Sequence, residues 1–128
     1  MAKIVWKEEP DERDYPAAAA YLSLLASDEL VMRIISELQS APLRRGMAKD
    51  ILRASRLELL PADDQHVAKY MAKVRAGKPL SPVLLIRGEV LHDITLHIAD
   101  GYHRVCAGYH LGEDSDIPYR MANLDRTP

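Results

Sequence analysis

The stretch that decides the fold is Ile98 to Gly112, IADGYHRVCAGYHLG. The residues that lead into it, ITLHI, alternate between apolar and polar types as a half-buried strand does. After the Asp-Gly pair, apolar side chains recur at the spacing of a short helix, which we expect from Tyr102 to about Leu111. Asp100 and Gly101 therefore lie at a strand-to-helix turn.

This turn has the ingredients of an anion-binding site. The first N–H groups of a helix have no acceptor within the helix, and they carry a partial positive charge. Gly101 allows an unusual backbone conformation and a close approach by a ligand. Arg104 adds a forked, permanently charged donor, and His103 adds a group that titrates near neutral pH. Two interpretations remain open: a phosphate-binding turn, and an Asp-Gly turn that begins a solvated helix.

Length and composition limit the classes of function. A chain of 128 residues corresponds to about one domain. Apolar residues make up 48% and charged residues 28%, as in globular proteins rather than disordered ones. The net charge of −2 gives no overall attraction to nucleic acid or to an anionic membrane. The single cysteine excludes an intramolecular disulfide, and the lack of a signal peptide or a membrane-spanning apolar run predicts a cytoplasmic protein without membrane contact.

Along the chain we expect one compact unit with three regions. They are an extended acidic arm at 1–16, an N-terminal helical pair at 17–45, and a mixed α/β domain at 46–128. In the pair, AAAAYLSLLA consists of good helix formers, and the segment after it has apolar residues at helical spacing. Residues 17–41 are either additional core or a surface that docks a partner protein or a second copy.

The clearest helix lies in the segment PADDQHVAKYMAKVRAGKPL. Asp63 or Asp64 can cap its start, and Gly77 followed by a proline ends it. One face carries the potential cations His66, Lys69 and Lys73. They are either a lysine-rich surface or the second wall of a phosphate site.

A second basic pattern lies in PLRRGMAKDILRASRLELLP. If this piece is helical, the spacing of four, four and three aligns its basic residues in one stripe, Arg45, Lys49, Arg53 and Arg56. The stripe is either a solvated face or a contact for nucleic-acid phosphates.

The remaining segments predict the fold class. SPVLLIR, ITLHIA and IPYRMA have the length and composition of strands. Together with the helices they predict an α+β fold, a small mixed sheet with helices that is preceded by the helical pair. The histidines do not fall at compact ligand spacings and there is no cysteine pair, so we expect no metal site fixed by the protein alone.

From about Ile51 to Asn123 the order of elements resembles the ParB N-terminal and sulfiredoxin superfamily. The matching pattern is ILRASRLELLP…HVAKYMAKVRAGKPLSPVLLIRG…LHIADGYHRVCAGYHLGEDSDIPYRMA, with a lead-in, a helix, a strand, a hairpin, a Gly-x-x-Arg turn and helix, and a closing strand. The resemblance covers somewhat more than half of the chain. It implies a ParB/sulfiredoxin-like fold in a stand-alone small bacterial domain, and a site for a nucleoside triphosphate or diphosphate such as ATP, ADP or CTP, with Mg²⁺.

The resemblance also implies which residues form this site. By matching position the phosphates would contact Gly101, Tyr102, His103 and Arg104. The preceding helix would contribute His66, Lys69 and Lys73. Asp100 would position a divalent ion or a water for weak NTP hydrolysis or phosphoryl transfer, or it would serve only as the turn residue that caps the next helix.

Three departures from the superfamily limit the inference. Sulfiredoxins carry their catalytic cysteine directly after the turn glycine, where this chain has Tyr102, so peroxiredoxin repair is not expected. Cys106 lies inside the helix, where we expect a buried thiol. Chromosome-partitioning ParB proteins have a Gly-Glu-Arg-Arg turn and a following helix-turn-helix domain, which this sequence lacks. Archaeal free-serine kinases have an Asp-Gly-His-Thr-Arg turn, but their catalytic glutamate has no identified counterpart here.

Three functional hypotheses follow. The first is a nucleotide-binding domain with weak NTPase or phosphotransfer activity. The second is a ParB-like nuclease or DNA-associated protein, in which the basic stripe binds DNA and His103 acts as a general base. The third is a non-enzymatic, nucleotide-sensing adaptor that docks a partner through residues 17–41.

Overall fold

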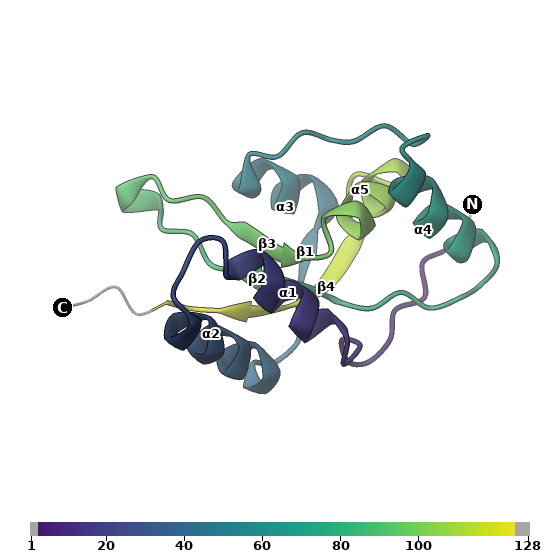
Figure 1. Ribbon diagram of the computed structural model, residues 1–128. Coiled ribbons are helices and arrows are strands. Elements are labelled where there is room, and N and C mark those ends of the chain that lie inside the picture. The colour runs from purple at the N-terminus through teal and green to yellow at the C-terminus, as the bar shows by residue number, and fades with distance from the viewer. Residues whose placement is uncertain (1–2, 125–128) are drawn as a thin grey trace.

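A four-stranded sheet lies between two layers of helices in the computed structural model, which describes residues 3–124 (Figure 1). The elements in chain order are α1 (Asp14–Leu22), α2 (Asp28–Ser40), β1 (Arg44–Met47), α3 (Ala48–Ser55), α4 (Gln65–Arg75), β2 (Val83–Ile86), the 3₁₀ turn η1 (Val90–His92), β3 (His97–Asp100), α5 (Tyr102–Leu111) and β4 (Asp116–Ala122). The ends of the outer predicted regions, residues 1–2 and 125–128, lie outside the described residues.

The sheet has the strand order β1-β4-β2-β3. The two central strands β2 and β4 run parallel, and each outer strand is antiparallel to its neighbour. This arrangement confirms the α+β class with a mixed sheet. It also makes β3, the strand that ends in the Asp-Gly turn, an edge strand of the sheet.

Strand β2 shows how the two helical layers are held. All four of its residues are buried, and they alternate between two apolar clusters. Val83 and Leu85 belong to the cluster that includes α3, α4 and α5, whereas Leu84 and Ile86 belong to the cluster that includes α1 and α2. The N-terminal helical pair is therefore one of the two layers of the core.

This packing places the inner face of residues 17–41 in the core. Its apolar side chains Leu22, Ile34 and Leu38 are at most 3% exposed and pack on the sheet. The inner face of the pair is core, and it is not available to dock a partner.

Two boundaries in the first half of the chain differ from the sequence prediction. The first helix begins at Asp14, inside the predicted arm, because Pro16 falls in the first helical turn, where a missing N–H has no partner to lose. Residues 44–47 form strand β1 rather than the start of a helix, since they pair with β4 through partners such as Arg44 and Tyr119. The arm itself is extended at Trp6, which forms a β-bridge with Leu80.

No helix within residues 3–124 is long and apolar enough to cross a membrane.

We predict that Leu38→Ala lowers the free energy of unfolding by about 3 kcal/mol, because it opens a cavity between α2 and the sheet. Leu38 is fully buried, and Met32 on the same helix is 72% exposed. Met32→Ala is the matched control and should change stability by less than about 0.5 kcal/mol. Chemical denaturation followed by circular dichroism measures both, and equal small effects would show that α2 does not pack as described.

Candidate functional site

The strand-to-helix turn lies where the sequence predicts it, and no side chain caps the helix that follows. β3 ends at Asp100, Gly101 is the N-cap residue, and α5 begins at Tyr102. The N–H of Val105 donates to the carbonyl of Gly101 over 3.0 Å, and no side chain caps the helix. The amides that precede Val105 are therefore the part of the turn that can receive an anion.

Gly101 is required here for two reasons. Its φ of 113° lies where residues with a side chain are strained. A Cβ at this position would also lie 2.4 Å from Cγ1 of Val83 and 2.9 Å from Nη2 of Arg104. The turn thus packs directly on the central strand β2, which fixes where α5 begins.

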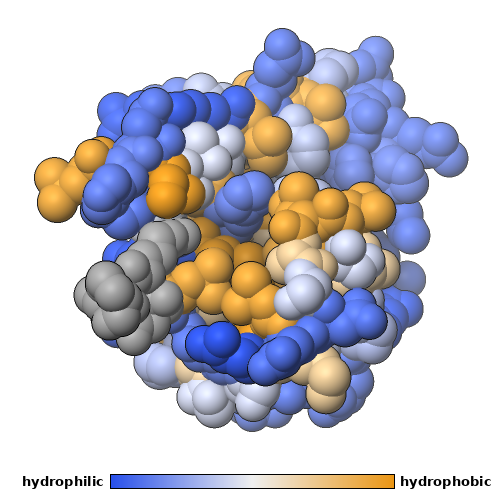
Figure 2. All heavy atoms as spheres, turned by 60° about the vertical axis from the view of Figure 1, so that its left-hand side comes forward, coloured by the Kyte–Doolittle hydropathy of each residue, from blue (hydrophilic) through white to orange (hydrophobic). Residues whose placement is uncertain are grey.

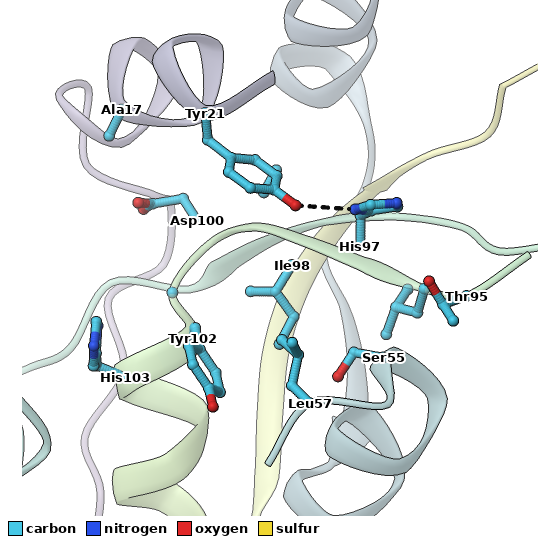
Figure 3. A pocket seen from close by; sticks show the side chains of 13 residues that line it. Ala17, Tyr21, Ser55, Leu57, Thr95, His97, Ile98, Asp100, Tyr102 and His103 are labelled. Atoms are coloured by element: carbon cyan, nitrogen blue, oxygen red, sulfur yellow. Dashed lines mark hydrogen bonds between the residues drawn. The ribbon is translucent and has the colours of Figure 1, made fainter. Parts of the chain in front are cut away.

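A cleft of about 510 Å³ adjoins this turn and runs along β3 (Figure 3). Residues 100–103 form part of its lining, together with Tyr21 of α1 and Leu57 after α3. The Tyr21 hydroxyl and Nδ1 of His97 are 3.1 Å apart, and a dashed line in Figure 3 marks this hydrogen bond at the cleft. The cleft is large enough for a small organic ligand.

The basic face of α4 meets the turn. The ring centroids of His66 on α4 and His103 on α5 are 4.7 Å apart. Tyr70 of α4 lies between two cations, with Nζ of Lys73 at 5.4 Å and Cζ of Arg104 at 5.8 Å from its ring centroid. The structure therefore brings two of the sequence motifs together at one place.

Lys73 lies in a concentration of positive charge. Burial lowers the pKa of Lys73, and four further cations lower it in the same direction: Lys69, Arg13, Lys7 and Lys78. Within residues 3–124, neither Lys69 nor Lys73 forms an ion pair with a carboxylate. Burial likewise lowers the pKa of His103, and the neighbouring His66 adds to this effect.

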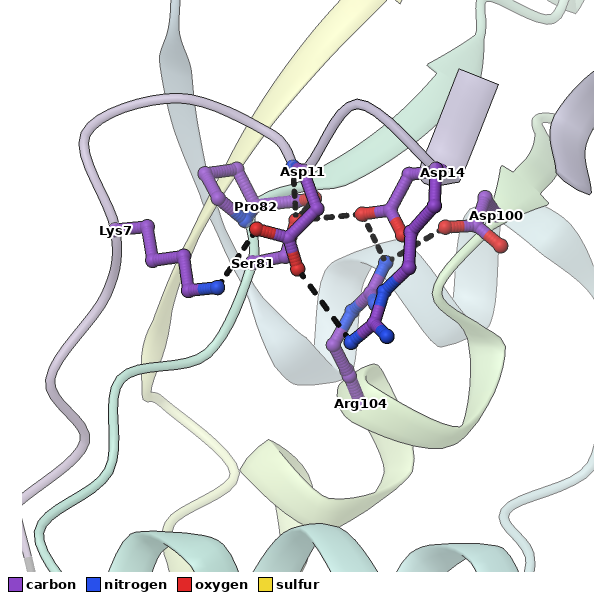
Figure 4. Close-up of polar contacts among 8 residues, drawn as sticks. Lys7, Asp11, Asp14, Ser81, Pro82, Asp100 and Arg104 are labelled. Atoms are coloured by element: carbon purple, nitrogen blue, oxygen red, sulfur yellow. Dashed lines mark hydrogen bonds and ion pairs between the residues drawn. The ribbon is translucent and has the colours of Figure 1, made fainter. Parts of the chain in front are cut away.

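Arg104 has a different environment from the one that a phosphate ligand would need. Its side chain is buried, and Nη2 lies 2.9 Å from Asp100 Oδ2 and 3.5 Å from Asp14 Oδ2 (Figure 4). Asp14 also accepts a hydrogen bond of 2.5 Å from the Ser81 hydroxyl. The guanidinium is therefore neutralised inside the protein by two carboxylates, and its exposed surface is too small for it to be the main phosphate contact.

Asp14 is a member of this cluster that sequence reasoning missed. It was included in the acidic arm, although an acidic residue before an alanine-rich helix is a recognisable helix-start signal. Asp100 lies between the buried cluster and the cleft. Burial raises the pKa of the Asp100 carboxyl, Arg104 opposes the rise, and the carboxylate of Asp14 adds to it.

The predicted basic stripe does not lie on a single helix. Arg45 lies on strand β1, Lys49 and Arg53 on α3, and Arg56 in the left-handed residue that ends α3. Three of the four are paired with carboxylates: Lys49 with Asp114 at 2.8 Å, Arg53 with Asp50 at 3.2 Å, and Arg56 with Asp93. These pairs neutralise the charge that a DNA-binding surface would need.

Two smaller expectations concern Cys106 and metals. Cys106 is fully buried in α5, and burial raises the pKa of its thiol, as expected for an inert core residue. No group of three or more His, Cys, Asp and Glu side chains within residues 3–124 is arranged to hold a metal ion.

Comparisons with family models, with curated proteins and with solved structures found no match to this chain.

We predict that Gly101→Ala lowers the free energy of unfolding by about 2 kcal/mol or more, since it adds both backbone strain and an overlap with Val83. Gly77 provides the control, because its φ is also positive, at 74°, but no atom lies within 4 Å of an added Cβ. Gly77→Ala should cost about 1 kcal/mol from backbone strain alone. If denaturation curves give the two variants equal losses, Gly101 does not pack against β2 as described.

Asp100 should give a distinctive pH dependence of stability. Its pKa in the folded protein is raised above the ordinary value of 3.8, so the folded state binds more protons than the unfolded state above that pH. The free energy of unfolding of the wild type, relative to that of Asp100→Asn, should therefore fall as the pH rises above about 4.

Asp93→Asn is the control for this pH series. The hydrogen bond from Arg56 lowers the pKa of Asp93 below 3.8, so its stabilising effect is lost only at more acidic pH. Denaturant titrations across the series should give a flat difference for Asp93→Asn. A flat difference for Asp100→Asn as well would contradict the raised pKa.

Proposed function

We propose that this chain is a nucleotide-binding domain of the ParB/sulfiredoxin-like class, which binds a nucleoside di- or triphosphate beside the turn at residues 100–103. One observation carries the proposal: the basic face of α4 and the uncapped start of α5 lie side by side, with His66 and His103 4.7 Å apart. Two features that are separate in the sequence would thus face the same ligand.

The phosphates would bind where positive charge is concentrated beside the start of α5. Lys69 and Lys73 repel each other, so a bound anion relieves an electrostatic cost that the free protein carries. The first amides of α5 and the imidazole of His103 would donate to the same phosphate. This division of roles gives α4 the charge and α5 the directional hydrogen bonds.

The organic part of the ligand would occupy the cleft along β3. The cleft begins at the turn and is lined by Tyr21, Leu57 and Ile98, which offer an aromatic ring and two apolar surfaces. Its volume of about 510 Å³ lies within the range of small-molecule sites, roughly 300–1,000 Å³. A nucleoside attached to the phosphate therefore has a place in direct continuation of the anion site.

In this proposal Arg104 is a positioning residue. It holds Asp100 and Asp14 through its guanidinium and so fixes the turn, while other groups contact the phosphate. Asp100 is the carboxylate that borders the cleft, and it would hold a Mg²⁺ ion together with the phosphates. Weak hydrolysis or phosphoryl transfer would use the charge stabilisation that this ion and the lysines supply.

The two alternative functions differ in whether they would use the proposed nucleotide site. A nucleotide-sensing adaptor would use the same site without turnover, so a phosphate-release assay with Asp100→Asn distinguishes it from an enzyme. A DNA-binding or nuclease function is less favoured, because Lys49, Arg53 and Arg56 are paired with carboxylates.

Isothermal titration with ATP, ADP, CTP and GTP in the presence of magnesium tests the proposal. We expect at least one nucleotide to bind, and the double variant Lys69→Ala/Lys73→Ala to weaken its affinity by about a hundredfold, or about tenfold for each lost cation. Arg75→Ala removes a cation from an exposed position of the same helix and should leave the affinity unchanged. Absence of binding to all four nucleotides, or wild-type affinity in the double variant, would refute the proposed site.

A further inference from the structure

The connection between β2 and β3 forms an arm whose tip exposes two large aliphatic side chains. Glu89 and Ile94 form an antiparallel bridge at its base, and η1 lies at its tip, to one side of the molecule in Figure 1. Val90 is 91% exposed and Leu91 is 87% exposed. Turn tips normally carry polar or small residues, so the tip presents apolar surface that this chain does not bury.

The tip is held in a defined conformation. The Glu89 carboxylate accepts a hydrogen bond of 3.1 Å from the Leu91 N–H and also contacts the His92 ring. Asp93 adopts a left-handed conformation and pairs with Arg56 at the end of α3. These contacts keep the two aliphatic side chains directed away from the body of the protein.

A hollow of about 700 Å³ lies beside the arm, larger than the cleft at the turn. Its lining includes six apolar or aromatic side chains from α3, the sheet and the arm: Ile51, Leu85, Ile94, Leu96, Tyr119 and Met121. Charged residues of both signs, such as Asp50, Arg53 and Glu89, lie among the lining residues. We call this hollow the socket.

We propose that the chain forms a twofold-symmetric homodimer in which the Val90–Leu91 tip of each copy enters the socket of the other. Tip and socket are neighbours on one chain, since Val90 itself borders the socket. A twofold axis between them forms both contacts at once and closes the assembly, as in isologous dimers.

A second copy is the occupant that this chain itself supplies, because the chain carries both an exposed aliphatic tip and a hollow with apolar lining. The socket is lined by charges of both signs, so a strongly acidic or strongly basic partner would meet like charges. The side from which the arm projects in Figure 1 is turned forward in Figure 2, where orange apolar residues interrupt the hydrophilic surface. The dimer would cover two of the most exposed aliphatic side chains of the described chain.

Sedimentation equilibrium over a wide range of protein concentrations tests this proposal. The wild type should dimerise, and Val90→Asp/Leu91→Asp should raise the dissociation constant at least about a hundredfold, because each dimer loses two buried tips. Leu24→Asp/Leu25→Asp is the matched control: this aliphatic pair is 83% and 59% exposed in the loop after α1, and its replacement should leave the dimer intact. Circular dichroism checks that both variants fold.

Cross-linking identifies the contact itself. A tagged Leu91→Cys chain mixed with an untagged Ala54→Cys chain should join through a short bis-maleimide, because Ala54 is an exposed residue of the socket. Ala20→Cys, exposed on α1, should not join to Leu91→Cys. The native Cys106 is buried and does not interfere.

Three results would overturn the proposal: a monomer at all concentrations, a dimer that survives the tip variant, and equal cross-linking to residues 54 and 20. A monomer whose tip binds another protein would assign the same surface to a different partner. The socket shares Leu96 with the lining of the cleft along β3 but no residue with the turn at 100–103, and the tip variant changes neither Leu96 nor the turn, so nucleotide binding is tested separately by titration.

Discussion

The interaction on which the rest of the structure depends is the buried guanidinium of Arg104 between Asp14 and Asp100. It joins the start of α1 in one helical layer, the end of the edge strand β3, and the first turn of α5 in the other layer. Removing one member of a buried ionic cluster leaves a charge without a partner, which is far more costly than the loss of a surface pair. The cluster therefore fixes the turn. It requires a glycine at position 101, because a Cβ there would overlap with Val83 of β2 and with the Arg104 guanidinium.

This constraint also redistributes the roles within the proposed site. Because Arg104 holds the turn, recognition of an anion would pass, in the proposed function, to neighbouring groups that form no ion pair with a carboxylate within residues 3–124: Lys69, Lys73 and the first amides of α5. The same cluster leaves Asp100 at the boundary between the interior and the cleft, where burial raises its pKa. The fold depends on the charges of Arg104, Asp14 and Asp100, which neutralise one another. The proposed function would depend on the neighbouring charges of Lys69 and Lys73.

The sequence predicts the elements whose signals are local. Helix α5 was predicted from Tyr102 to Leu111 and has these bounds, because its apolar spacing and the Asp-Gly turn both lie within a few residues. Strand β2 follows from a short run of apolar residues, although the prediction was longer at both ends. The resemblance, rather than the spacing of residues, implies that the helix with His66 and the turn with His103 contribute to one site, and the two rings lie 4.7 Å apart.

The parts that could not be predicted depend on contacts between distant residues. Strand β1 is formed from Arg-Arg-Gly-Met, which has little strand propensity, and its partner is β4, more than 60 residues away. The role of Asp14 arises from its contacts with Arg104 and Ser81, and two residues of the basic stripe, Lys49 and Arg56, are paired with Asp114 and Asp93, which approach them in space. One measurement tests the central claim most directly: a two-dimensional NMR titration of the ¹⁵N-labelled protein with ADP and magnesium. We expect the largest shifts at the amides of residues 101–104 and along the basic face of α4. Shifts confined to other regions, or no shifts at all, would contradict this claim.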